Sequence, residues 1–318
     1  MGAAAPLISI PEAQVPPGAQ AEWFQGADGA RLRAALFTPA DGARGAVVLS
    51  PGRTEPIEKY YEVIRELMAR GFQVLAHDWR GQGLSVRLLS DRLRGHAGGP
   101  DEFVTDFEAL LDAFGPRLTE PWLSLGHSMG GCLALLALVR GERRFAGAIL
   151  TAPMLAIAVG PLSQQLARVT AGAALRIGRA ATYVQPVYDP LADRFSADAL
   201  THDRARYDRY KAQLRAAPDL ALAGPTWGWL RFALDAAAAI AAPGALESVT
   251  IPVSLVLAGD DRLVLNAASR SAARRLPKGV CVEIPGAYHE ILIETDQLRG
   301  PFWRAFDTLS AGLTGRLS

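Results

Sequence analysis

The sequence predicts an α/β protein built on a mostly parallel sheet, with one helical insertion. Short apolar runs alternate with helical patterns through the first 150 residues, and the same alternation resumes after residue 250. Residues 153–248 between them contain helical patterns and no comparable apolar run. Because buried parallel strands read as short continuous apolar runs, this alternation is typical of βαβ units.

Eight strands are predicted, the first two as an antiparallel hairpin. Between Ala21 and Thr38, two partly alternating segments flank the turn Gly-Ala-Asp-Gly, which is a hairpin pattern. The other six runs are Ala46–Leu49, Phe72–Ala76, Trp122–Leu125, Ala146–Leu150, Val253–Leu257 and Val280–Ile284. Helices are expected to begin near Ile57, Glu102 and Gly131 and to cover the sheet.

The insertion divides the chain into a core and a cap. Residues 21–153 and 249–318 are predicted to form the core, and residues 154–248 a helical cap over the carboxyl ends of the strands. Residues 1–20 contain four prolines and no basic residue, which suits neither a secretory signal nor a membrane-spanning helix. We expect a flexible leader there.

Charge and cysteine content restrict the partners and the compartment. Thirty-three basic and 32 acidic residues leave a net charge of +1, so no strong field favours nucleic acid, and a small-molecule substrate is expected. Two cysteines are too few for a disulfide framework. A cytoplasmic protein is therefore predicted.

Ser128 is the predicted nucleophile. Residues 121–131 read PWLSLGHSMGG, so an apolar strand runs into the pattern G-x-S-x-G and then into a helix-forming segment. That pattern between a strand and a helix forms a tight turn that exposes the serine hydroxyl, and its glycines avoid clashes in the turn. The following helix start offers free N–H groups to a developing oxyanion.

A serine hydroxyl needs a base, and His289 is the favoured one of five histidines. It follows the last predicted strand and a turn, late in the chain, where a loop can return to Ser128. An aspartate after the preceding strand can orient the imidazole, and Asp260 and Asp261 both lie there. The chain order Ser, Asp, His agrees with this assignment.

Two backbone N–H groups are predicted to form the oxyanion hole. One belongs to Met129, directly after the nucleophile, and the other to Arg53 in the loop after the strand at Ala46–Leu49. The alternative for residues 50–55 is a Pro-Gly turn of purely structural use.

Several segments together resemble the lysophospholipase and monoacylglycerol lipase branch of the α/β-hydrolases, over roughly residues 20–310. They are SPGRTEPIEKYYEVI, HDWRGQGLSVRLLSDRLRGH, LGHSMGG, LTHDRARYDRY, GPTWGWL and IPGAYHEILIETD. The resemblance implies an α/β-hydrolase fold, a triad of Ser128, Asp261 and His289, and a cap that forms an acyl-chain groove. It favours Asp261 over Asp260, and it implies no cofactor and no metal. Pro51-Gly52 stands where monoacylglycerol lipases have His-Gly.

The implied activity is hydrolysis of a monoacyl lipid ester, either a lysophospholipid or a monoacylglycerol, through an acyl-enzyme intermediate. The alternatives are a short-chain carboxylesterase or serine aminopeptidase on the same scaffold, and a noncatalytic binding protein. Arg204, Arg206 and Lys211 of the cap either meet a phosphate or form a solvated helix face. Apolar residues 155–175 either contact a membrane surface, such as the inner membrane, or cover a pocket.

Overall fold

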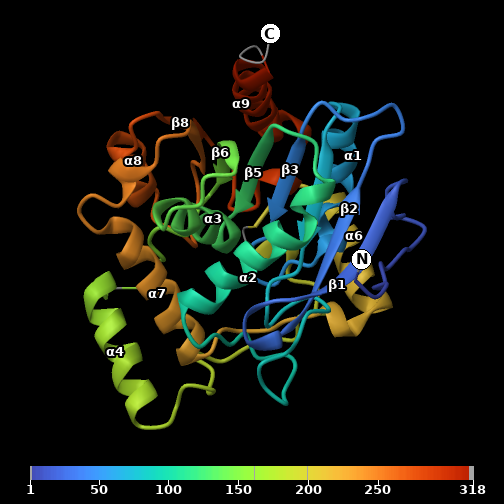
Figure 1. The fold of residues 1–318 in the computed structure, drawn as a ribbon. Helices are drawn as coiled ribbons and strands as arrows, with labels where there is room; N and C mark the ends of the chain where they lie inside the picture. The colour runs from blue at the N-terminus through green and yellow to red at the C-terminus, as the bar shows by residue number, and fades with distance from the viewer. Residues whose placement is uncertain (1, 161, 199, 315–318) are drawn as a thin grey trace.

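The computed structural model describes residues 2–160, 162–198 and 200–314, which form an eight-stranded sheet with helices on both faces (Figure 1). The strands are β1 (Ala19–Gln25), β2 (Arg31–Phe37), β3 (Ala46–Ser50), β4 (Gln73–His77), β5 (Trp122–His127), β6 (Phe145–Thr151), β7 (Val253–Ala258) and β8 (Gly279–Ile284). Their order is β1-β2-β4-β3-β5-β6-β7-β8, with β2 antiparallel to both neighbours and all other pairs parallel. The predicted mostly parallel sheet of eight strands is confirmed.

The helices begin close to their predicted positions. They are α1 (Tyr61–Ala69), α2 (Pro100–Phe114), α3 (Met129–Val139), α4 (Gln164–Arg176), α5 (Phe195–Asp198), α6 (Arg204–Ala216), α7 (Trp227–Ala241), α8 (Asn266–Arg275) and α9 (Asp296–Thr314). In Figure 1, α2 and α3 cover the near face of the sheet, whereas α1 and α9 pack together on the far face, where Arg70 pairs with Asp307.

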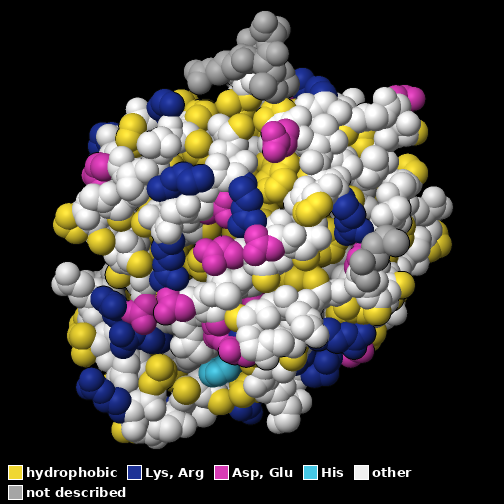
Figure 2. Space-filling view, viewed as in Figure 1, with side chains coloured by type: hydrophobic (Ala, Val, Ile, Leu, Met, Phe, Trp, Pro, Cys, Tyr) yellow, Lys and Arg dark blue, Asp and Glu magenta, His cyan; other side chains and the backbone are white. Residues whose placement is uncertain are grey.

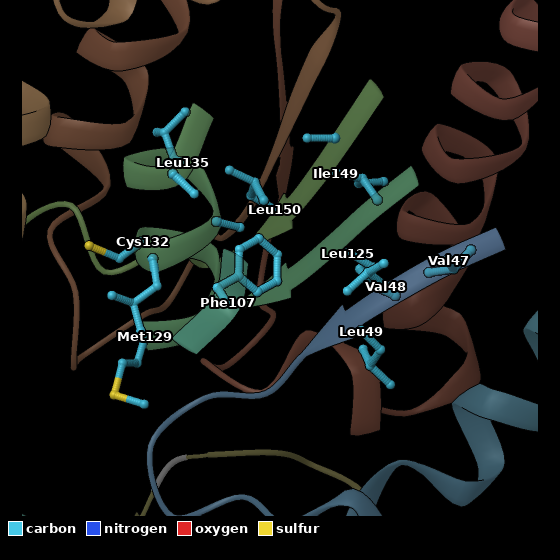
Figure 3. Packing of buried hydrophobic residues seen from close by; sticks show 14 of the residues in the cluster. Val47, Val48, Leu49, Phe107, Leu125, Met129, Cys132, Leu135, Ile149 and Leu150 are labelled. Atoms are coloured by element: carbon cyan, nitrogen blue, oxygen red, sulfur yellow. The ribbon is translucent and has the colours of Figure 1, made fainter. Parts of the chain in front are cut away.

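The core lies around the central strands and α3. Every residue of β3, β5 and β7 is buried, as is each residue of α3 from Met129 to Leu138, because this helix lies between β5 and the insertion helix α7. In Figure 3, Leu150 of β6 lies beside Phe107 of α2 and Leu135 of α3, all three of them buried in the core. This packing fixes the junction of β5 and α3, where Ser128 lies.

The N-terminal residues differ from the expected flexible leader. Ala5 N donates to Ala21 O, and Trp23 N donates to Ala3 O, so this segment pairs with the outer side of β1. Ile8 is held from both sides, since its N–H donates to Glu58 and its carbonyl accepts from the Tyr61 hydroxyl. The prolines that suggest flexibility also suit an extended chain, and an edge strand offers such a chain unpaired backbone groups.

Residues 154–248, here called the helical insertion, leave the sheet after β6 and return to it at β7. Within their described part they contribute α4 to α7 and no strand of the sheet. Helix α7 packs on α2 and α3, α4 packs on α7, and α6 packs on the 3-10 turn Ile57–Tyr60. The insertion thus lies over the loops that follow the carboxyl ends of the strands.

The surface carries mixed charge. On the face shown in Figure 2, Lys and Arg side chains alternate with Asp and Glu side chains, in keeping with the net charge of +1. No helix in the described ranges combines the length and the apolar character that crossing a membrane requires.

A buried ion network joins three core segments. Arg33 of β2 donates to Glu58 and to Asp78, and none of these side chains is exposed. Asp78 also accepts from Ile57 N and Leu84 N. Because one cation serves two buried carboxylates, its removal would leave both without compensation.

Arg33→Met is therefore expected to lower the free energy of unfolding by about 3–5 kcal/mol, measured by urea denaturation. Arg31→Met is the matched control, because Arg31 lies on the same strand but is exposed and contacts the ring of Trp23. Its cost should stay below about 1 kcal/mol. A similar loss in both variants would contradict the role given to the network.

Candidate active site

Ser128 occupies a strained turn between β5 and α3. Its backbone has φ 50° and ψ −112°, a region that L-residues rarely adopt. A Cβ on Gly130 would lie 2.2 Å from Ser50 O, and a Cβ on Gly126 would lie 2.7 Å from the Gly131 Cα. The two glycines of the motif are thus required by close backbone approach. Ser128 N donates to Thr151 O, which anchors the turn to the end of β6.

Two loops at the same edge of the sheet bring a histidine and an aspartate to Ser128. His289, after β8, has its Nε2 2.9 Å from Ser128 Oγ. Asp261, after β7, has its Oδ2 2.7 Å from His289 Nδ1. The three side chains therefore form one continuous hydrogen-bonded relay from three distant parts of the chain.

The surroundings of Asp261 keep it ionised. Burial alone would raise its pKa, but the hydrogen bond and charge of His289 and the amides of Val264 and Leu263 hold the pKa below its ordinary value. The neighbouring Asp260 is exposed. The structure therefore brings Asp261, and not Asp260, to the imidazole.

Three of the other four histidines have partners elsewhere. His77 Nε2 lies 3.1 Å from Ser50 Oγ, His96 Nδ1 lies 2.9 Å from Thr226 Oγ1, and His202 Nδ1 lies 2.8 Å from Glu294. His127 lies next to the site, its ring centroid 5.0 Å from that of His289. Burial lowers the pKa of His127 to about 4, so this ring is neutral at pH 7.

The loop of residues 51–55, here called the donor loop, lies beside the nucleophile. Gly52 N is taken by Glu55 Oε2, whereas Arg53 N and Met129 N donate to no protein oxygen among the described residues. The close contact of Gly130 with the carbonyls of Ser50 and Pro51 places the start of α3 against this loop. Both predicted oxyanion donors are thus unoccupied at adjoining backbone segments.

A second sequence motif, residues 78–85 of the segment HDWRGQGLSVRLLSDRLRGH, holds the donor loop from behind. Trp79 Nε1 donates to Pro51 O at 2.9 Å, and Gln82 Nε2 donates to Gly52 O at 2.7 Å. This second motif therefore has a positioning role.

A buried charged cluster next to His289 was not identified from the sequence. Lys59 Nζ lies 2.7 Å from Glu55 Oε1 and 2.5 Å from Glu290 Oε1. Burial alone would raise the pKa of Glu55, but Lys59 holds it at about 2. At Glu290 the effect of burial is the larger one, and it raises the pKa of that carboxyl. In the sequence, the i,i+4 spacing of Glu55 and Lys59 is the pattern that could have indicated this cluster. The cluster ties the donor loop to the residue after His289.

A cavity of about 600 Å³ opens onto Ser128 and His289. Its core side includes Arg53 and Glu290, and its insertion side is mainly apolar, with Ile157, Leu162, Trp227 and Leu230 among its lining residues. A pocket of this size with an apolar wall and a few polar groups is typical of small-molecule sites. Within the described residues, no three His, Cys, Asp or Glu side chains group as metal ligands.

The basic residues of α6 lie away from this cavity. Arg204 pairs with Asp193 and Asp208, Arg206 pairs with Glu62, and Lys211 donates to Pro190 O. None is among the cavity's described lining residues. The structure therefore does not bring this stretch to the cavity. The solvated helix face holds for Arg204 alone, because Lys211 is buried and the Arg206 side chain is only 11% exposed.

The arrangement is suited to acyl transfer. An imidazole within hydrogen-bond reach can accept the serine proton, the aspartate can stabilise the resulting imidazolium, and two amides can bind a carbonyl oxygen.

Comparisons with known proteins agree with this chemistry. Residues 41–296 match the family described as serine aminopeptidase, S33. The chain is 34% identical over 288 residues to lysophospholipase L2 of Escherichia coli strain K12, an alignment that covers 87% of this chain and 83% of that protein. It is 29% identical to the monoacylglycerol lipase of Mycolicibacterium smegmatis, over 86% of this chain and 91% of that lipase.

Solved structures share the fold. A soluble variant of monoglyceride lipase from Saccharomyces cerevisiae, in complex with a substrate analog, superposes with a TM-score of 0.73 at 19% identity, covering 96% of this chain and 97% of that one. A carboxyl esterase from Bacillus coagulans superposes with a TM-score of 0.71 at 18% identity, covering 93% of this chain and 99% of that one.

Asp261→Asn is expected to slow the labelling of Ser128 by a fluorophosphonate by about 10²–10⁴-fold, because an amide cannot stabilise the imidazolium and favours the wrong tautomer. The rate of labelling is measured directly with a fluorescent probe. Asp260→Asn is the matched control and should leave the rate unchanged. If Asp260→Asn slows labelling as much as Asp261→Asn does, Asp261 is not the carboxylate on which the relay depends.

Proposed function

We propose that this chain, which belongs to the serine aminopeptidase S33 family of hydrolases and to its lysophospholipase and monoacylglycerol lipase branch, is a serine hydrolase that cleaves carboxylic esters of monoacyl lipids. The resemblance found in the sequence is confirmed by these relatives, and their activities on lipids favour lipid esters over the short-chain and peptide alternatives. The observation that carries the proposal is the relay from Asp261 through His289 to Ser128 at the wall of a largely apolar cavity.

The proposed reaction is a two-step acyl transfer. His289 removes the Ser128 proton, the hydroxyl oxygen attacks the ester carbonyl, and the amides of Arg53 and Met129 bind the oxyanion. His289 then gives its proton to the departing alcohol, which leaves an acyl-enzyme. Water activated by the same histidine releases the fatty acid and restores the serine.

We also propose that the helical insertion, residues 154–248, acts as the cap and that its apolar wall holds the acyl chain. Its residues supply most of the apolar lining of the cavity, whereas the core supplies the charged and catalytic groups. Apolar burial is roughly proportional to chain length, so a long acyl chain gains more in this cavity than a short one.

Ser128→Ala is expected to lower the hydrolysis of 1-oleoylglycerol and 1-oleoyl lysophosphatidylcholine by about 10⁴-fold or more, because the nucleophile is lost. Released oleate is measured by mass spectrometry. Ser124→Ala is the matched control, since Ser124 is buried on β5, the strand that leads to Ser128, and its Oγ has no hydrogen-bond partner among the described residues.

Two outcomes would contradict this proposal. Full activity in Ser128→Ala would exclude the assigned nucleophile. Wild-type turnover confined to acetate esters, with none on long acyl chains, would favour a short-chain esterase instead.

We further propose that residues 162–177, which contain α4, contact a lipid surface from which substrate enters. Leu162, Ala167 and Thr170 line the cavity, while Leu166, Val169 and Ile177 are 51%, 68% and 71% exposed. An apolar outer surface on the segment that also lines the pocket is typical of a membrane-contacting element.

The combined variant Leu166→Gln, Val169→Gln and Ile177→Gln should weaken binding to phospholipid vesicles at least about tenfold, because apolar side chains would no longer be buried in lipid. Binding is measured by co-sedimentation. Leu265→Gln with Val280→Gln is the control, since these apolar residues are about half exposed on the core. An equal loss in both proteins would argue against residues 162–177 as the contact.

A further inference from the structure

Arg53 brings an uncompensated positive charge to the cavity that contains Ser128. Its guanidinium donates from both Nη1 and Nη2 to Ala223 O at 2.8 Å and lies 5.3 Å from the ring centroid of Trp229. Arg53 and Trp229 both line the cavity. Within the described part of the chain, no carboxylate pairs with this guanidinium and no oxygen accepts from its Nε.

Three other buried cations of this fold have acidic partners. Arg33 pairs with Glu58 and Asp78, and Arg80 pairs with Asp106. Lys59 even has two carboxylates. A buried charge is costly unless an opposite charge compensates it, so the lack of one at Arg53 leaves a site for an anion from outside the chain.

The charge of Arg53 persists under physiological conditions. Burial lowers its pKa to about 10, so the guanidinium stays protonated at pH 7. A carbonyl oxygen occupies only one donor position on each of two nitrogens, and a guanidinium has five N–H donors in a planar fork. The remaining donors suit the oxygens of a phosphate.

We propose that the Arg53 guanidinium binds the phosphate of a lysophospholipid head group while Ser128 attacks its ester, so that Arg53 makes the site prefer lysophospholipids to monoacylglycerols. This inference rests on the proposed function. The backbone N–H of Arg53 is the proposed donor to the ester oxygen, and its side chain extends along the cavity toward Ala223 and Trp229. One residue would thus contact both ends of the glycerol unit that separates ester from phosphate.

The test compares two substrates with the same acyl chain, 1-oleoyl lysophosphatidylcholine and 1-oleoylglycerol, in mixed detergent micelles. In Arg53→Met, the ratio of kcat/KM for the phospholipid to kcat/KM for the glyceride should fall about 10- to 100-fold, as expected for the loss of charge-assisted hydrogen bonds. Using the ratio cancels any effect that the substitution has on both substrates. Arg53→Lys, which keeps the charge but not the fork, should give an intermediate ratio.

Arg87→Met is the matched control. Arg87 also has no carboxylate in its side-chain hydrogen bonds and also ties the core to the insertion, by donating to Asp219 O and Ala221 O, but it is not among the lining residues of the cavity. It should lower Tm without changing the substrate ratio. If Arg53→Met also lowers Tm and leaves the substrate ratio unchanged, Arg53 only joins the core to the insertion, and the inference is overturned.

A second measurement uses the wild-type protein, in case Arg53→Met does not fold. Glycerol 3-phosphate should inhibit turnover of p-nitrophenyl butyrate at concentrations at least about tenfold lower than glycerol does, since only the former carries the phosphate. Equal inhibition by the two compounds would overturn the inference. Wild-type protein that cleaves neither oleoyl substrate would overturn the proposed function and this inference with it, whereas an unchanged ratio in Arg53→Met overturns the inference alone.

Discussion

The close approach of α3 to the end of β3 is the constraint on which the site depends. Parallel pairing of β3 with β5 brings their carboxyl ends to one edge of the sheet. There Gly130 meets the carbonyls of Ser50 and Pro51 so closely that a Cβ would lie within 2.5 Å of both oxygens. A side chain at position 130 would separate the donor loop from Ser128. Ser128 and the proposed oxyanion donors are therefore adjacent because two backbones meet without side chains between them.

Buried charges then hold the loops that this contact brings together. Asp78 joins β2, the start of the 3-10 turn and residue 84, while Lys59 joins the donor loop to Glu290, the residue after His289. Such pairs are costly to desolvate, so they specify geometry more than they add stability. The insertion side of the cavity is instead apolar and contributes shape. One wall of the cavity thus carries charged and hydrogen-bonded groups and the other is apolar, which suits an enzyme that acts on acyl chains.

Much of the fold was predictable because its signals are local. Apolar runs marked six of the eight strands, a hairpin pattern marked the first two, and the glycine spacing around Ser128 marked the turn before any tertiary contact was known. His289 followed from chain order. The choice between Asp260 and Asp261 depended on the orientation of the turn after β7. Two adjacent aspartates in a sequence do not reveal which of them faces the histidine. The bond from Lys59 to Glu290 spans 231 positions, and Arg206 pairs with Glu62 on α1 and Asp296 on α9, so no local pattern encodes these three contacts.

The pairing of the N-terminal residues with β1 has a consequence for self-association. An unpaired outer strand is a template on which a second chain can add by backbone hydrogen bonds, and this is a common route to aggregation. Here the chain occupies part of that template itself, with Ala3 and Ala5 bonded to β1. At the opposite end of the sheet, β8 carries the charged Glu283, paired with Arg270, and a charged side chain opposes strand addition. The protein thus protects its two sheet ends by different means, one by its own backbone and the other by charge.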